Sequence, residues 1–253
     1  MMHETRENKI SKLIDNCAKK IEGISLEEIE MIKQFYYKDN RSYEEIEKKI
    51  ISLSEKLLLA SNMVNKEIDQ DILDKSIIII GPMGAGKSSV GYLLSKRLSI
   101  PRISLDDRKG LSYLYEQQKN FDNLKEFEFF LTGTVLTNLS EPHVIDFGAG
   151  HSVYENKIMF NKMKQLISRF SNVILLMPCE DKEESLAIMN KRKGIEKGSR
   201  REFSNKHFIN IPCNYELSTI TEYTKDKTVE EIVDEIIEKI SSKDLGENYE
   251  RKK

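Results

Sequence analysis

The hydrophobic residues divide the chain into two parts that meet near Asp74. Before this residue they recur at intervals of three and four positions, which predicts amphipathic helices. We expect three of these helices, at about 6–21, 26–37 and 43–68. The segments Ser25–Glu28 and Ser42–Glu45 each place a carboxylate three residues after a serine, as the capping box at a helix start does. The first part of the chain therefore predicts a small all-helical region.

The third helix carries a long apolar stripe, made of Tyr43, Ile46, Ile50, Leu53, Leu57, Ala60 and Val64. Such a stripe either packs on the neighbouring domain or forms the seam of a coiled-coil dimer. The joint at residues 36–46 also resembles a helix-turn-helix, but Glu44, Glu45 and Glu47 at the start of the second helix would repel phosphates. We therefore expect a monomer or a helix-mediated dimer, and no nucleic-acid partner.

After Asp74 short apolar runs alternate with amphipathic segments. The apolar runs predict strands at 77–80, 102–105, 144–147, 173–177 and 219–223. The segments between and after them predict helices at 90–98, 111–139, 157–169, 183–192 and 229–240. Strands separated by helices favour an α/β fold in which helices cover both faces of a parallel sheet. The tail from Ser241 is expected to be frayed.

Composition narrows the class of protein. The chain has 253 residues with 40 basic and 42 acidic side chains, a balance that argues against a general polyanion binder. Apolar runs such as Ile77–Ile80 are too short to cross a membrane, and the polar N-terminus does not resemble a secretory signal. Three widely spaced cysteines suit neither a disulfide framework nor a zinc site. We expect a cytoplasmic protein without a membrane partner.

The strongest motif is Gly81–Ser88, which matches the phosphate-binding P-loop pattern G-x-x-x-x-G-K-[ST]. It lies directly between a predicted strand and a predicted helix, where backbone amides and the helix dipole favour an anion. Lys87 should reach the β- and γ-phosphates, and the Ser88 hydroxyl should bind Mg²⁺. The predicted ATP-binding residues are Gly81, Met83, Gly84, Ala85, Gly86, Lys87, Ser88 and Ser89.

Residues 81–91 resemble the P-loop of the shikimate kinases, including a glycine one turn into the helix. The resemblance implies a P-loop kinase with a five-stranded parallel sheet, a mobile lid and ATP-dependent phosphorylation of shikimate to shikimate 3-phosphate. It covers about residues 74–241, so it leaves a helical N-terminal region at 1–73 and a tail at 242–253. It also implies a role in aromatic amino acid biosynthesis, with ATP and Mg²⁺ as cofactors and a small molecule as the partner.

The family carries an Asp-x-Asp after its second strand, which supplies a Mg²⁺ contact and then a substrate contact. These positions fall on Ser104 and Asp106. Asp106 therefore retains the catalytic and substrate-binding role, whereas Ser104 is a departure. Either Asp107 or Asp146 can replace the missing acid, and the predicted metal residues are Ser88 and Asp146. Asp146 follows two apolar strand residues, as a Walker B acid does.

The remaining family motifs are partial. Lys125 stands where an arginine grips the substrate carboxylate, and Gly148, Ala149 and Gly150 stand where three glycines approach the substrate. No arginine occurs at residues 210–215, where the family has a second carboxylate contact. These departures leave open a kinase of another small acceptor, or a non-catalytic nucleotide-binding regulator.

The basic segment Lys191–Arg201 occupies the position of the lid. Cations in such a lid stabilise the charge on the transferring phosphoryl group. The predicted catalytic residues are therefore Lys87, Asp106, Arg192 and Arg200, with Arg201 as an alternative lid cation. His151, in the turn after the third strand, is either a site residue or, as is more common for a lone histidine in a turn, solvated.

Overall fold

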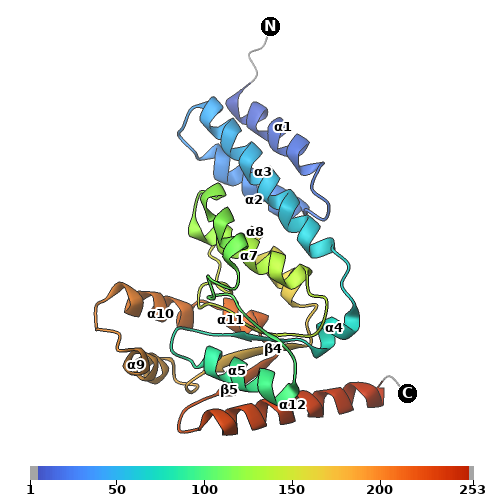
Figure 1. The fold of residues 1–253 in the computed structure, drawn as a ribbon. Helices are drawn as coiled ribbons and strands as arrows, with labels where there is room; N and C mark the ends of the chain where they lie inside the picture. Colours follow the sequence, from blue (N-terminus) through green and yellow to red (C-terminus); the bar gives the residue numbers. More distant parts are fainter. Residues whose placement is uncertain (1–4, 251–253) are drawn as a thin grey trace. The chain divides into compact units, whose positions relative to one another are not determined.

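The computed structural model describes residues 5–250, and the side chains up to residue 243. It divides the chain into two compact units, of which one ends at Glu67 and the other begins at Ile68 (Figure 1). The short helix α4 (Gln70–Lys75) begins the second unit. Each unit has its own buried apolar residues.

The first unit consists of α1 (Arg6–Ala18), α2 (Leu26–Tyr37) and α3 (Tyr43–Asn65). Both predicted capping boxes are confirmed. In the first, Ser25 Oγ accepts from the Glu28 amide at 3.1 Å, and Glu28 Oε2 accepts from the Ser25 amide at 2.8 Å. The second forms the same pair of bonds between Ser42 and Glu45. These local bonds explain why α2 and α3 begin where the sequence predicts.

The apolar stripe of α3 packs largely within this unit. Ile50, Leu53 and Leu57 line a small apolar gap together with Ile14 of α1 and Ile32 of α2. The expectation that the stripe packs on the neighbouring domain is therefore wrong for these residues, because α1 and α2 offer them apolar side chains nearby. The helix-mediated dimer stays a prediction.

The second unit is built on a five-stranded sheet, which confirms the predicted fold class. Its strands are β1 (Ile77–Ile80), β2 (Arg102–Ser104), β3 (Val144–Asp146), β4 (Asn172–Met177) and β5 (Ile220–Tyr223). They are parallel and lie in the order β2-β3-β1-β4-β5. The central position of β1 explains why its four isoleucines are buried on both faces.

Helices cover both faces of this sheet. The helices of this unit after α4 are α5 (Lys87–Leu98), α6 (Ser112–Tyr115), η1 (Glu116–Asn120), α7 (Leu124–Thr137), α8 (Lys157–Ile167), α9 (Lys182–Lys193), α10 (Arg200–Asn210), α11 (Cys213–Leu217) and α12 (Val229–Glu250). In Figure 1, α5 and α12 lie side by side on one face, and α7, α8 and α11 lie on the other. Within residues 5–250, the helices are too short or too polar to span a bilayer.

Several stretches differ from the predicted elements, and the short helix α4 lies where no element was expected. The helix expected at 111–139 is interrupted at Phe121–Asn123, because Asn123 caps α7 by accepting from the Glu126 amide at 3.0 Å. The sequence also missed α10 and α11; α10 begins where Ser199 Oγ accepts from the Glu202 amide at 3.3 Å. Finally, α12 continues to Glu250, although the predicted helix ends at residue 240. The fraying expected from Ser241 stays a prediction, and 251–253 lie outside the described residues.

Candidate active site

The P-loop connects the end of β1 to the first turn of α5. Its glycines at 81, 84 and 86 all have positive φ angles. A Cβ atom on Gly81 would lie 2.5 Å from the Leu176 carbonyl oxygen of β4, and one on Gly84 would lie 2.8 Å from the Met189 carbonyl oxygen of α9. The loop can therefore pass between these two elements only with glycine at both positions.

Lys87 is enclosed by this loop. Its side chain is buried, and its Nζ donates to the carbonyl oxygens of Gly81 at 2.8 Å and Pro82 at 3.0 Å. Burial lowers the pKa of Lys87 to about 8, against the opposing effect of the carboxylates of Asp106 and Asp146. The amine thus lies at the helix N-terminus, the place where an anion would bind.

Asp146 lies at the end of β3, beneath the P-loop. Its Oδ2 accepts from Ser104 Oγ at 2.9 Å and from Ser88 Oγ at 3.3 Å, and its Oδ1 accepts from Arg102 Nε at 2.6 Å. Ser104 and Asp146 are register partners on neighbouring strands, so the carboxylate of Asp146 lies directly beside Ser104. Ser88 and Asp146 together supply oxygen atoms of the kind that Mg²⁺ prefers.

A cleft of about 1020 Å³ opens above the carboxyl ends of the strands. Most of the predicted site residues line it, namely Met83, Gly84, Gly86, Lys87, Ser88, Ser89, Asp106, Lys125, Ala149, Gly150, Arg192 and Arg200. Gly81, Ala85, Asp146 and Gly148 do not line it, although all four are buried in the same unit. A Cβ atom on Gly148 would collide with the Asp106 carboxylate, so this glycine makes room for Asp106.

Lys125 lies on the side of the cleft formed by α7. Its Nζ donates to Glu128 Oε2 at 2.7 Å and to the Gly150 carbonyl oxygen at 2.8 Å, and it stands 5.8 Å from the centre of the Tyr154 ring. The lysine therefore joins α7 to the loop after β3. Sequence reasoning missed Glu128, although its spacing of three residues from Lys125 on a helix was a usable signal.

His151 is buried, so the expectation that it is solvated is wrong. Its Nδ1 lies 3.0 Å from Thr132 Oγ1 of α7. Burial, followed by the nearby charges of Lys125 and Lys87, lowers the pKa of His151 to about 3. A neutral histidine thus holds the loop after β3 against α7.

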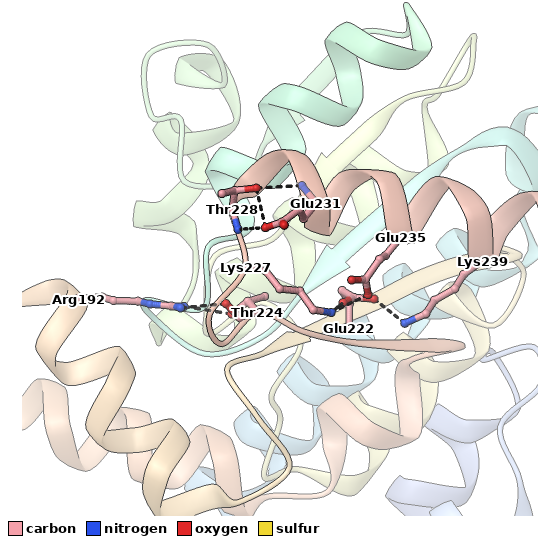
Figure 2. Close-up of polar contacts among 8 residues, drawn as sticks. All are labelled: Arg192, Glu222, Thr224, Lys227, Thr228, Glu231, Glu235 and Lys239. Carbon is pink, nitrogen blue, oxygen red and sulfur yellow. Dashed lines mark hydrogen bonds and ion pairs between the residues drawn. The ribbon is translucent and has the colours of Figure 1, made fainter.

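The two predicted lid arginines lie in different environments. Arg200, the first residue of α10, lines the cleft. Arg192 also reaches the cleft, but its guanidinium donates to Thr224 Oγ1 at 3.1 Å and to the Thr224 carbonyl oxygen at 3.2 Å, just after β5 (Figure 2). Arg201, the alternative, is not among the residues that line the cleft.

Two more residues of the lid were missed by the sequence. Lys193, at the end of α9, lines the cleft beside Gly84. Asn205 of α10 is fully buried; its side chain accepts from the Met83 amide and donates to the Met83 carbonyl oxygen, both at 3.0 Å. Nothing in the local sequence signals this contact, because the two residues are 122 positions apart.

Comparisons with known proteins find shikimate kinases among both the related sequences and the similar solved structures. The family model for shikimate kinase matches residues 83–241, more than half of the chain. The shikimate kinase of Aquifex aeolicus is 29% identical over 185 residues, which cover 67% of this chain and 98% of that protein. The shikimate kinase of Flavobacterium johnsoniae is 27% identical over 176 residues, which cover 65% and 98%. A structure of shikimate kinase from Acinetobacter baumannii in complex with shikimate shares the fold, with a TM-score of 0.50 and 21% identity over 69% of this chain and 97% of that one.

Proposed function

Because the chain belongs to the shikimate kinase family, we propose that it transfers the γ-phosphoryl group of ATP to a hydroxyl group of shikimate. The observation that carries the proposal is the single cleft in which the P-loop, Asp106 and Lys125 meet. The P-loop supplies a site for a nucleotide, and the opposite wall supplies a carboxylate and a cation for an acceptor. A phosphotransferase needs both a nucleotide site and an acceptor site.

On the nucleotide side, the amides of the P-loop and the Lys87 ammonium would hold the β- and γ-phosphates. To do so, the ammonium exchanges its bonds to the Gly81 and Pro82 carbonyls for bonds to phosphate oxygens. Arg200 would approach from the lid and stabilise the charge that spreads over the transferring group. Ser88 and Asp146 would hold Mg²⁺, which neutralises phosphate charge when it is bound.

On the acceptor side, Asp106 would accept a hydrogen bond from the reacting hydroxyl and take its proton as the oxygen attacks. Gly148 leaves the space that this carboxylate occupies. Lys125 would pair with the acceptor's carboxylate while Glu128 and Gly150 hold it in place. A lysine lacks the two-point geometry of arginine, so this contact is weaker than the family's usual one.

The test is ADP release by the full chain with Mg·ATP and shikimate. Turnover that disappears in Lys87→Ala and falls at least about 100-fold in Asp106→Asn supports the proposal. ATP binding without turnover on shikimate would reject it. A screen of other small hydroxy acids would then separate a kinase of another acceptor, which the Lys125 site and the missing arginine would suit, from a non-catalytic regulator.

A further inference from the structure

The last turn of α9 contains three adjacent basic residues, and two of them, Arg192 and Lys193, reach different parts of the unit. Successive residues of an α-helix project about 100° apart. The guanidinium of Arg192 reaches Thr224, to which it donates two hydrogen bonds. The side chain of Lys193 lies beside Gly84 of the P-loop.

Thr224, the residue that Arg192 binds, belongs to a firmly held segment. Two residues earlier on β5, the buried carboxylate of Glu222 pairs with Lys227 at 2.9 Å and also with Lys239 of α12 (Figure 2). After it, Thr228 caps α12, with its amide donating to Glu231 Oε2 at 2.7 Å. The hydrogen bonds from Arg192 therefore attach the end of α9 to Thr224, a residue that the neighbouring ion pairs and helix cap hold in place.

The contact between Arg192 and Thr224 places Lys193 next to the P-loop. A Cβ atom on Gly84 would lie 3.2 Å from Lys193 Cγ, and Lys193 lines the cleft together with Gly84, Gly86 and Lys87. No residue in the described part of the chain forms an ion pair or hydrogen bond with its amine. The positive charge of Lys193 also contributes to the lowered pKa of Lys87.

We propose that Lys193 binds the nucleotide's polyphosphate from the lid side, and that Arg192 is a positioning residue that holds α9 so that Lys193 can do so. This inference rests on the proposed function, because it requires that ATP binds the P-loop. Two cations of the cleft lining, Lys87 and Lys193, would then both pair with the phosphates. An anion between them relieves the repulsion that both experience in the free protein.

The test is isothermal titration of the full chain with Mg·ATP and Mg·ADP in the absence of acceptor. Lys193→Met removes the charge and keeps most of the chain length. It is expected to weaken binding of both nucleotides by about 10- to 100-fold, the effect of losing one hydrogen bond to a charged group. Lys193→Arg should restore most of the affinity. Lys191→Met is the matched control, since Lys191 is an exposed lysine of the same turn that does not line the cleft.

The role of Arg192 requires a double-mutant cycle. Arg192→Met should weaken ATP binding when Lys193 is present and have little further effect when Lys193 is already methionine, because its contribution passes through Lys193. Additive losses would show that Arg192 contacts the nucleotide independently of Lys193 and would overturn the positioning role.

The outcomes separate this inference from the proposed function. Equal affinities of Lys193→Met and Lys191→Met for ATP would overturn the role of Lys193 and leave the kinase proposal standing. Failure of the unaltered chain to bind ATP would reject the proposed function and this inference with it.

Discussion

Lys87 shows at the scale of a single residue how this site is prepared for an anion. Its ammonium lies inside the P-loop and bonds to two carbonyl oxygens rather than to a carboxylate. Since burial is the largest cause of its lowered pKa of about 8, a bound polyphosphate, which brings negative charge close to the amine, must raise that pKa. Nucleotide binding is thus linked to proton uptake.

The sign of this linkage gives a prediction. Consider a pH between the pKa of Lys87 in the free protein, about 8, and its higher pKa in the complex. In this range the complex holds more protons than the free protein, so ATP affinity falls as pH rises. We expect a loss approaching tenfold per pH unit above about pH 8. Titration calorimetry in buffers of different ionisation enthalpy measures both the affinity and the proton uptake. In Lys87→Met the pH dependence should vanish, and its persistence there would assign it to another group.

A second residue-scale feature is the ion pair between Arg102 and Asp146. The Asp146 side chain is 3% exposed and that of Arg102 is 26% exposed, at an Nε–Oδ1 distance of 2.6 Å. Removing the arginine would leave a buried carboxylate with only hydroxyl partners, Ser88 and Ser104.

We therefore expect Arg102→Met to lower the free energy of unfolding by about 3 kcal/mol, since an uncompensated buried charge is costly. Urea unfolding followed by circular dichroism measures the change. The double variant Arg102→Met with Asp146→Asn should recover most of the loss, because no unpaired charge remains. Equal losses in the single and double variants would show that the charge of Asp146 is not the cause.

At the scale of elements, the lid and the P-loop are joined by Asn205. Its amide bonds to both backbone groups of Met83 and thereby holds α10 against the loop. Helix α9 contacts the same loop at Gly84. The position of the lid and the conformation of the P-loop are therefore coupled through these contacts.

Asn205→Ala should loosen this coupling. We expect faster amide hydrogen exchange at Met83 and faster proteolysis within residues 194–199, which connect α9 and α10, at a cost of about 1–3 kcal/mol for the lost buried bonds. Lys206→Ala, at the exposed neighbouring position, is the control. Unchanged exchange at Met83 would mean that other contacts hold the loop.

At the scale of the whole molecule, the site and the N-terminal helices belong to different units. All residues that line the cleft lie after Ile68, and the family model matches 83–241. Helices α1 to α3 have their own apolar core, which includes Ile10, Ile14, Ile46 and Ile50.

A chain that begins at Ile68 should therefore fold and keep its affinity for ATP within about threefold of the full chain, because it loses no cleft residue. Titration calorimetry of both chains tests this expectation. Light scattering of the same two chains tests the helix-mediated dimer. If α1 to α3 mediate a dimer, the full chain is dimeric and the truncated chain is monomeric. Equal oligomeric states would reject the dimer.

Much of this architecture follows from local sequence. The capping boxes fix the starts of α2 and α3, the β-branched run at 77–80 predicts a buried central strand, and the spacing of Gly81, Gly86 and Lys87 specifies the P-loop. Such features are readable because the interacting groups lie within a few residues of one another, so that spacing alone sets their geometry.

Only the tertiary structure determines the contacts between residues that lie far apart in the sequence. The fold pairs Arg102 with Asp146 across 44 positions, directs Arg192 to Thr224, buries His151 against Thr132 and closes Asn205 onto Met83. A local pattern identifies the charge or the amide but not the group that it meets, because that partner is chosen by strand order and helix packing. The sequence by itself therefore determined a nucleotide-binding α/β unit, and the packing decided which of its cations are free to meet a phosphate.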